Sequence, residues 1–378
     1  MKKTATFVLL LTTVIVLSMC SAAAANPNKA DYTYLQPEGA VFDMNAYYNE
    51  KDPALECNVT IKQTGGSVNV PDIPTTPMPK ANERFTVGFS VYYTVDEVGA
   101  MILDTMVSAA AEAGVELLVN DANYDQNAQN QAIEQWILQG VDGVILAPCD
   151  FHGVQEALNQ LNEANIPVVT LNPPLAGTAD TIVTADCVEQ GALAGKMLVD
   201  YLNAAGIPLK GKVIFQTLPF VHPNAVTRAL GFAEQFKDYP DVEIVEITGI
   251  SPEEHYTAFD GALRANPDMI GAFGLYSSAT IGMMNAKLAA DSDVPLTSID
   301  NDKIILAGIK EGNIIGSACY SSMAPAWWCM SLIVNILNGE TVPGTVYYEN
   351  KAVTAENVDA MFEHYYPGQT LAGYMSGE

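Results

Sequence analysis

A set of aromatic, acidic and amide side chains stands directly after apolar runs that are typical of β-strands. The set is Tyr92, Tyr93, Asp121, Asn172, Phe220, His222, Tyr276 and Asp300. Aromatic rings stack on apolar surfaces, and carboxylates and amides hydrogen-bond polar groups in pairs. These side chains at strand ends therefore indicate contacts with a small polar ligand. The alternative is that the aromatic members pack at the edges of the fold.

The sequence offers little for catalysis, metal binding or nucleic-acid binding. It holds neither a G-x-S-x-G turn nor an H-E-x-x-H motif, and its 4 His are scattered. We therefore expect no metal, no cofactor and no enzyme, although the many Asp and Glu leave a carboxylate pair open. The formal net charge of −27 argues against nucleic acid, because neutralising phosphates needs clustered Lys and Arg.

A parallel sheet would bring the strand-end residues together, and residues 85–171 predict one. Short β-rich apolar runs alternate there with segments whose apolar residues recur every three to four positions. We read four strands and three helices, a pattern that is typical of a parallel sheet with helices on both faces. In such sheets ligands bind outside the carboxyl ends of the strands.

A second series of the same kind follows from residue 212 onward. Its expected strands span residues 212–215, 242–247, 270–273, 296–299 and 314–319, with helices between them. A chain of 378 residues exceeds what one core usually supports, so two lobes are expected. The predicted fold class is therefore α/β, with two similar, doubly wound parallel-sheet lobes whose strand-end loops line a cleft.

The first 82 residues differ from the rest. Lys2, Lys3, the apolar run 7–19 and the small residues 21–25 predict an export signal over residues 1–25 rather than a membrane span. The segment Leu17-Ser18-Met19-Cys20 resembles a lipobox, in which Cys20 would carry lipid, whereas residues 23–25 offer a conventional cleavage site. Residues 26–82 predict an extension whose proline-rich end is a semi-extended tether, and whose earlier part could pack on the lobes.

Six cysteines raise the question of disulfides. Cys20 lies in the signal region and Cys57 in the extension, while the other four are Cys149, Cys187, Cys319 and Cys329. There is no C-x-x-C pair, and two disulfides stay open because connectivity cannot be read from spacing. Buried free thiols are the favoured interpretation, since Cys is commonly a core residue.

Residues 84–357 resemble the type I periplasmic solute-binding proteins of the ribose-binding kind, which serve ABC importers. The matching pieces, in order, are VGFSV, AGVELLVNDANYDQNAQNQAIEQWILQGVDGVILAP, ANIPVVTLN, IVTADCVEQGALAGKMLVDYL, RALGF, NPDMIGAF and PLTSIDND. The resemblance implies a three-stranded hinge, with crossings near residues 184–187, 320–323 and 348–352. The first lobe would then hold residues 84–185 plus 321–349, and the second lobe residues 186–320 plus 350–378.

The resemblance also bears on individual ligand contacts. Asp300 stands where the family has its second-lobe ligand-binding aspartate, and Arg228 matches an arginine that precedes a Gly-Phe pair. Tyr320 replaces a glutamine at a hinge crossing, and we include it among the expected contacts. Two alternatives remain: Asp300 could cap a helix over residues 301–310, and Arg228 could form a salt bridge on a helix surface.

The sequence departs from the family pattern at several ligand positions. Val98-Gly99 replaces paired phenylalanines, Asn172-Pro173 replaces an Asp-Arg pair, and Tyr276-Ser277 replaces an Asn-Asp pair. The expected cleft is therefore more aromatic and less charged than ribose needs. A modified sugar, a furanosyl signal, a nucleoside or an aromatic polar solute fits at least as well as a plain pentose.

The resemblance implies an exported solute receptor that closes over a sugar-like ligand and presents it to the membrane subunits of an ABC permease. We expect a monomer, either lipid-anchored at the outer face of the cytoplasmic membrane or free in the periplasm or cell envelope. The alternative is a sensory protein that presents its closed form to a chemoreceptor or kinase. Regulators with the same lobes begin with a DNA-binding helix-turn-helix, whereas this chain begins with an export signal.

Overall fold

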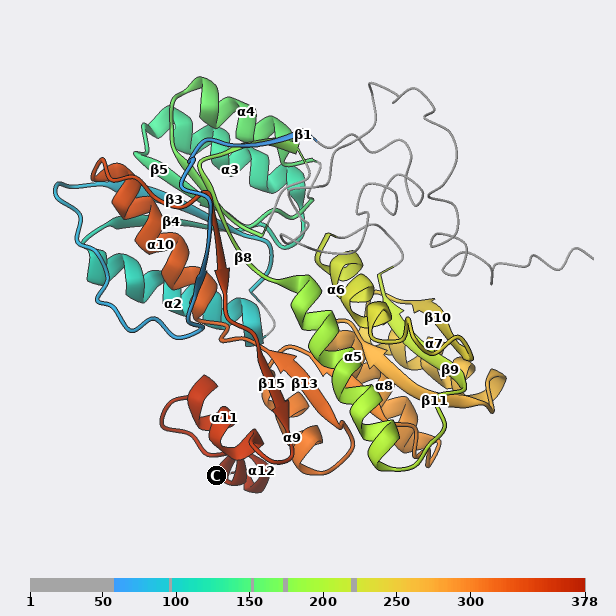
Figure 1. Cartoon of the computed structure of the whole chain (residues 1–378). Helices are drawn as coiled ribbons and strands as arrows, with labels where there is room; N and C mark the ends of the chain where they lie inside the picture. Colours follow the sequence, from blue (N-terminus) through green and yellow to red (C-terminus); the bar gives the residue numbers. More distant parts are fainter. Residues whose placement is uncertain (1–57, 95–96, 151–152, 173–175, 219–222, 378) are drawn as a thin grey trace, which may run out of the picture.

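The chain forms two lobes, each built on one large β-sheet with helices on both faces (Figure 1). The computed structural model describes residues 58–94, 97–150, 153–172, 176–218 and 223–377. Each lobe has its own apolar cores between sheet and helices. The two-lobed α/β fold that the sequence predicts is confirmed.

The first lobe contains a seven-stranded sheet in the order β2-β14-β8-β6-β5-β3-β4. All neighbouring strands in it are parallel. The strands are β2 (Ser67–Val70), β3 (Thr86–Val91), β4 (Glu116–Asp121), β5 (Gly143–Leu146), β6 (Val168–Leu171), β8 (Thr181–Ala185) and β14 (Thr345–Tyr348). A separate parallel pair joins β1 (Asn58–Ile61) to β7 (Ala176–Ala179).

Helices cover both faces of the first-lobe sheet. One face carries α2 (Glu97–Ala113) and α10 (Ala324–Leu337), and the other carries α3 (Gln126–Gln139) and α4 (Gln155–Glu163). Successive residues of a strand point to opposite faces, so Val87 and Phe89 enter the core beneath α2 and α10. Gly88 faces α3 instead, where an added Cβ would lie only 2.5 Å from the ring of Trp136.

The second lobe contains a six-stranded sheet in the order β10-β9-β11-β12-β13-β15, with β15 antiparallel at its edge. The strands are β9 (Gly211–Thr217), β10 (Val242–Thr248), β11 (Met269–Gly274), β12 (Leu296–Ile299), β13 (Gly316–Cys319) and β15 (Lys351–Thr354). One face carries α5 (Cys187–Ala204) and α6 (Pro223–Glu234). The other carries α7 (Pro252–Ala265), α8 (Ser277–Ala289), α9 (Lys303–Lys310), α11 (Val358–Tyr365) and α12 (Leu371–Ser376).

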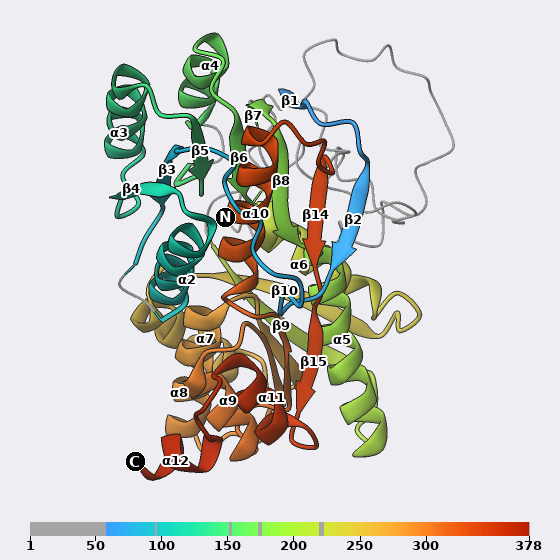
Figure 2. The same cartoon turned by 90° about the vertical axis from the view of Figure 1, so that its left-hand side faces the viewer.

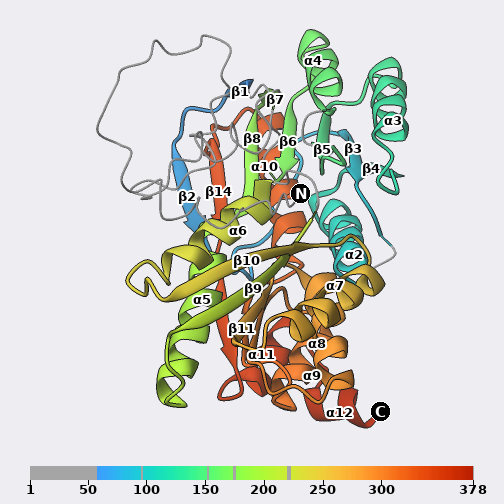
Figure 3. The same cartoon turned by 90° about the vertical axis from the view of Figure 1, so that its right-hand side faces the viewer.

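Helices α5 and α6 cross in direct backbone contact. A Cβ at Gly191 would lie 1.8 Å from the carbonyl oxygen of Arg228, and one at Gly231 would lie 1.9 Å from that of Val188. Any larger residue at either position would push the helices apart, because interiors are packed without spare room. Figure 3 shows α6 on the side of the second lobe that faces the first lobe.

The chain passes between the two sheets three times. β8 leads into α5 through Asp186, β13 into α10 through residues 320–323, and β14 into β15 through residues 349–350. β14 and β15 follow one another from the first lobe into the second (Figure 2). The first and third crossings are in contact, because Asn350 Nδ2 donates to the carbonyl oxygen of Asp186 at 3.0 Å.

Residues 58–82 belong to the first lobe, so the expected tether over residues 26–82 is wrong for this part. β2 adds an edge strand beside β14 (Figure 2). Further along, Met78 is 2% exposed in the first-lobe core, and the backbone N–H of Ala81 donates to the carbonyl oxygen of Ala113. The prolines thus turn a segment that packs against the lobe through its apolar residues. Residues 26–57 lie outside the described part of the chain.

The cysteines of the two lobes are not joined in disulfides. Cys149, Cys187, Cys319 and Cys329 are free, and all except the half-buried Cys149 are buried. The interpretation as buried free thiols is confirmed for Cys187, Cys319 and Cys329. Cys20 and Cys57 fall outside the described residues. Among the described helices, none has both the length and the apolar character that a membrane span requires.

Candidate functional site

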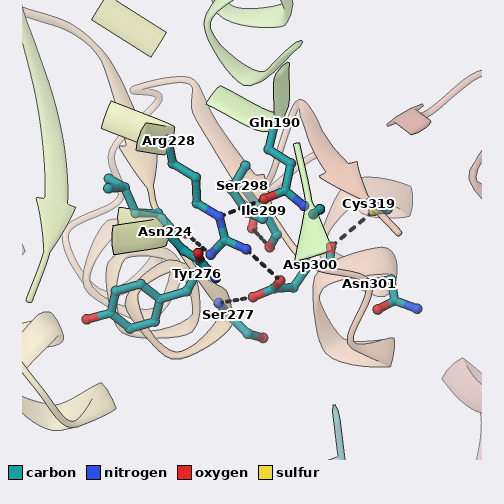
Figure 4. A network of polar contacts seen from close by, with 12 residues as sticks. Gln190, Asn224, Arg228, Tyr276, Ser277, Ser298, Ile299, Asp300, Asn301 and Cys319 are labelled. Atoms are coloured by element: carbon teal, nitrogen blue, oxygen red, sulfur yellow. Dashed lines mark hydrogen bonds and ion pairs between the residues drawn. The ribbon is translucent and has the colours of Figure 1, made fainter. Parts of the chain in front are cut away.

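Asp300 lies at the carboxyl end of β12, in a left-handed backbone conformation with φ of 76°. Its side chain accepts a hydrogen bond from the backbone N–H of Ser277 at 2.9 Å, at the first turn of α8 (Figure 4). Asp300 is 7% exposed, so its carboxylate is held in a buried position at the end of the strand. The capping position of α9 is occupied by Asp302, so the alternative that Asp300 caps this helix is wrong.

Arg228 faces Asp300 from α6. Its Nη2 lies 3.8 Å from Asp300 Oδ1, Nε donates to Gln190 Oε1 at 2.7 Å, and Nη1 donates to the carbonyl oxygen of Leu275 at 2.9 Å (Figure 4). Arg228 is only 8% exposed, so the alternative of a salt bridge on the helix surface is wrong. The guanidinium is held on three sides, which fixes the direction of its remaining donors.

Tyr276 stands between β11 and α8, and its hydroxyl group contacts residues of the second lobe that follow β10. The hydroxyl oxygen lies 2.8 Å from His255 Nε2 and 3.4 Å from the carbonyl oxygen of Gly249. Burial lowers the pKa of His255 to about 4, so its imidazole is neutral at physiological pH. Burial also raises the pKa of Tyr276, which therefore keeps its proton.

A group of tyrosines stands at the strand ends of the first lobe. Tyr124 stacks on Tyr92 and Tyr93, with ring centroids 5.7 and 5.1 Å away. Tyr124 is 61% exposed and was not among the expected contacts, although it follows β4 in the sequence. Tyr124 also contributes, after burial, to the raised pKa of Tyr276 in the second lobe.

Asp121 is exposed and belongs to the turn that carries Tyr124. Its Oδ1 accepts from the backbone N–H of Asn123 at 3.0 Å, and its Oδ2 accepts from the hydroxyl of Thr94. Both bonds stay within the first lobe. Asp121 therefore shapes the loop that carries Tyr124, and its role as a ligand contact stays a prediction.

Among the described residues, side-chain contacts join the two lobes at several places, including the bond between Asp72 and His364. Asn172, which follows β6 with φ of 69°, accepts a hydrogen bond from Asn224 of α6 at 3.2 Å. Glu97 of α2 forms an ion pair with Lys303 of α9 at 3.1 Å and also accepts from the Lys303 backbone N–H at 3.2 Å. These contacts describe a closed arrangement of the lobes.

Tyr320 lies in the second crossing, beside the charged pair. Its ring centroid is 5.2 Å from that of Tyr348. Burial, followed by the negative charge of Asp300, raises the pKa of Tyr320 well above its usual value, so its hydroxyl stays protonated. Tyr320 and Tyr92 both pack against the first-lobe core.

Among the expected contacts, Arg228 and Asp300 form an ion pair, and Asn172 of the first lobe contacts α6, the helix that carries Arg228. Tyr92 and Tyr93 stack on Tyr124 in the first lobe, Tyr276 follows β11, and Tyr320 lies in the second crossing. The roles of these residues as ligand contacts stay predictions. Phe220 and His222 lie outside the described residues. Two buried groups behind the site, Gln190 and His255, were not expected, because only tertiary structure brings them to Arg228 and Tyr276.

The arrangement suits recognition of a polar molecule. A fixed carboxylate and guanidinium can bind hydroxyl groups in pairs, and tyrosine rings can stack on C–H surfaces. Within the described ranges, His, Cys, Asp and Glu form no group of three or more that could hold a metal ion.

Comparison with known proteins gives a consistent result. A family model described as the periplasmic binding protein domain matches residues 87–341. The ribose import binding protein of Bacillus subtilis is 24% identical over 276 residues, which cover 71% of this chain and 88% of that protein. The xylitol-binding protein of Mycolicibacterium smegmatis is 25% identical over 268 residues, covering 68% of this chain and 74% of that protein.

A solved structure extends the similarity to three dimensions. An ABC transporter solute binding protein from Mycobacterium smegmatis, with bound glycerol, matches this structure with a TM-score of 0.70 at 26% identity. The match covers 76% of this chain and 99% of that one, so it includes residues of both lobes.

Proposed function

The chain belongs to the periplasmic binding protein domain family, and from this we propose that it is an extracytoplasmic solute-binding protein of an ABC importer. It captures a sugar or a sugar-like polar molecule between its lobes. The observation that carries the proposal is the buried ion pair of Arg228 and Asp300, which Gln190, Leu275 and Ser277 hold in place through hydrogen bonds. The similar proteins named for ribose and xylitol support a ligand rich in hydroxyl groups.

Each proposed contact has a role that follows from its chemistry. Asp300 accepts from ligand hydroxyl groups, and Arg228 and Asn172 donate to ligand oxygens. Tyr92 and Tyr93 supply aromatic surface for C–H groups. The remaining proposed contacts are Tyr276 through its aromatic ring, Tyr320 as a hydroxyl donor and, from outside the described residues, Phe220 and His222.

The mechanism is closure of two lobes about the three crossings. Ligand bound between the lobes contacts both, so binding free energy favours the closed arrangement over the open one. No bond of the ligand is broken in this mechanism. The closed form then docks on the permease subunits. The comparisons name import proteins and give no support to the sensory alternative.

Three further features belong to the proposal. The N-terminal residues 1–25 act as an export signal, and Cys20 carries the lipid that anchors the protein to the outer face of the membrane. The protein works as a monomer. Labelling with radioactive palmitate in the expression host, comparing Cys20→Ser with the natural sequence, tests the anchor without reference to ligand.

Thermal unfolding against a panel of sugars tests the function. The panel holds D-ribose, D-xylose, D-allose, D-galactose, xylitol, myo-inositol and adenosine. A ligand at 100 times its Kd adds about 2.7 kcal/mol to the stability of the native protein, which raises Tm by several degrees. If none of the panel raises Tm and none is transported, the proposed function is wrong.

A matched pair of variants then assigns the site. Asp300→Asn keeps the size of the side chain and tolerates the left-handed backbone, but it removes the charge. We expect it to weaken binding about 10- to 100-fold, since a hydrogen bond to a buried charge contributes about 1.5–3 kcal/mol. Asp260→Asn removes a carboxylate that pairs with Arg264 on α7, and it should leave binding unchanged.

A further inference from the structure

Behind the charged pair lies a chain of two buried amides, Gln190 and Asn350. Gln190 is fully buried and Asn350 is 8% exposed. Gln190 Nε2 donates to Asn350 Oδ1 at 2.9 Å, and Gln190 Oε1 accepts from Arg228 Nε at 2.7 Å. Figure 4 shows Gln190 on one side of the Arg228 guanidinium and Asp300 on the other. The guanidinium is therefore held between a carboxylate and a buried amide.

The direction of every hydrogen bond in this chain is fixed. Arginine has donors only, so the group of Gln190 that meets Arg228 must be its oxygen. The amide nitrogen of Gln190 then points at Asn350, which must present its own oxygen. This leaves the Asn350 nitrogen to donate, and it does so to Glu189 Oε2 at 2.8 Å and to the carbonyl oxygen of Asp186 at 3.0 Å. Rotation of either amide by half a turn would break the chain.

The far end of the chain lies in the hinge. Asn350 is in the crossing between β14 and β15, and Asp186 forms the crossing between β8 and α5. The two amides come from positions 160 residues apart in the sequence. Two of the three crossings are thus connected to Arg228 through side-chain hydrogen bonds.

We propose that Asn350 and Gln190 are positioning residues, which hold the Arg228 guanidinium in its ligand-binding direction and tie that direction to the hinge. Asn350 acts through Gln190 and does not contact Arg228 itself. The close approach of α5 and α6 supports this role, because the backbone of Arg228 cannot shift relative to Gly191, the neighbour of Gln190. The inference rests on the proposed function in so far as Arg228 is a ligand contact.

A purely structural role is the competing explanation. The amides would then only satisfy one another's hydrogen bonds, as most buried polar groups must. Removing them would lower stability but would leave the surroundings of Arg228 as they are. A measurement on the guanidinium itself separates the two explanations.

The sequence provides favourable conditions for such a measurement, because it holds three arginines, Arg84, Arg228 and Arg264. The side chains of Arg84 and Arg264 are 85% and 78% exposed, whereas that of Arg228 is 10% exposed. In a ¹⁵N-labelled sample, the Nε–H signal of Arg228 should exchange with water at least 100-fold more slowly than the other two. The exposed arginines serve as internal references in every variant.

Four variants complete the test. Asn350→Ala and Gln190→Met should each speed exchange at Arg228 at least 10-fold. Gln190→Glu keeps an oxygen acceptor for Nε but loses the donor to Asn350, so the exchange at Arg228 should be faster than in the wild type and slower than in Gln190→Met. Asn266→Ala, a control, removes an amide that accepts from Lys212 at the opposite ends of the strands, and it should leave the Arg228 signal unchanged. Circular dichroism verifies that each variant is folded. If Asn350→Ala does not fold, the exchange rate of Arg228 in Gln190→Met, which conserves the side-chain volume, replaces it as the deciding measurement.

The outcomes separate the positioning role of Asn350 and Gln190 from the proposed binding of a sugar. If the Arg228 signal in Asn350→Ala keeps its wild-type exchange rate, or if the control loses it equally, the positioning role is wrong. Titration with D-ribose and with xylitol is measured in parallel, and a 10-fold or greater loss of affinity in Asn350→Ala is expected. If neither sugar binds the wild type while the exchange rates follow the expectation, the positioning role stands and these two sugars are removed from the proposed function.

Discussion

Adding one methyl group at Gly231 should separate α5 from α6. A Cβ there would lie 1.9 Å from the carbonyl oxygen of Val188, whereas a close carbon–oxygen contact is about 3.3 Å, so the helices must move by about 1.4 Å. Overpacking of this kind costs about 3 kcal/mol or more when backbone has to move. Alanine offsets up to about 1 kcal/mol through its better helix propensity. We therefore expect Gly231→Ala to lower the free energy of unfolding by about 2 kcal/mol at least.

Gly261→Ala is the matched control, because Gly261 lies on α7 with no atom within 4 Å of an added Cβ. This variant should be more stable than the wild type by about 0.5–1 kcal/mol. Urea unfolding followed by circular dichroism measures both changes. If Gly231→Ala stays within about 0.5 kcal/mol of the wild type, or if both alanines cost the same, the direct backbone contact of α5 and α6 is refuted.

Three further changes test other parts of the structure. The folded-state pKa of His255 is about 4, below the unfolded value of about 6.5, so its contribution to stability is complete above pH 6.5 and is lost as pH falls to 4. Urea unfolding across this range should show up to about 3 kcal/mol of loss that is absent in His255→Gln. Asp72→Ala should cost about 1–3 kcal/mol in the same assay, because it leaves His364, 2.8 Å from the buried carboxylate, without its partner. Glu97→Gln should increase the radius of gyration of the ligand-free protein in solution scattering, by removing about 0.5–1 kcal/mol from the closed arrangement.

The positions of several site residues could be predicted because strand ends are local features. Asp300 and Tyr92 each follow a short β-rich apolar run, and the carboxyl ends of parallel strands meet at one edge of a sheet. The residue types at these strand ends did not reveal which groups their side chains would bind. That Asp300 binds the first turn of α8, and that Asp121 closes a turn in its own lobe, depends on side-chain geometry.

The features that could not be predicted depend on contacts between distant parts of the chain. β2 is four residues long, and it pairs with β14, a strand near the other end of the chain. The prolines near β2 favoured the prediction of a tether over residues 26–82, since proline removes a backbone donor and breaks regular structure. The bond between Gln190 and Asn350 likewise has no local signal, because an amide in sequence carries no sign of its partner.

A crystal structure of the protein with the panel compound that most raises Tm tests the central claim most directly. We predict one sugar-like molecule enclosed between the lobes, within hydrogen-bond distance of Asp300 and Arg228 on one side and in contact with Tyr92 on the other. A molecule bound wholly within one lobe, or on the outer surface and away from Asp300, would contradict the account.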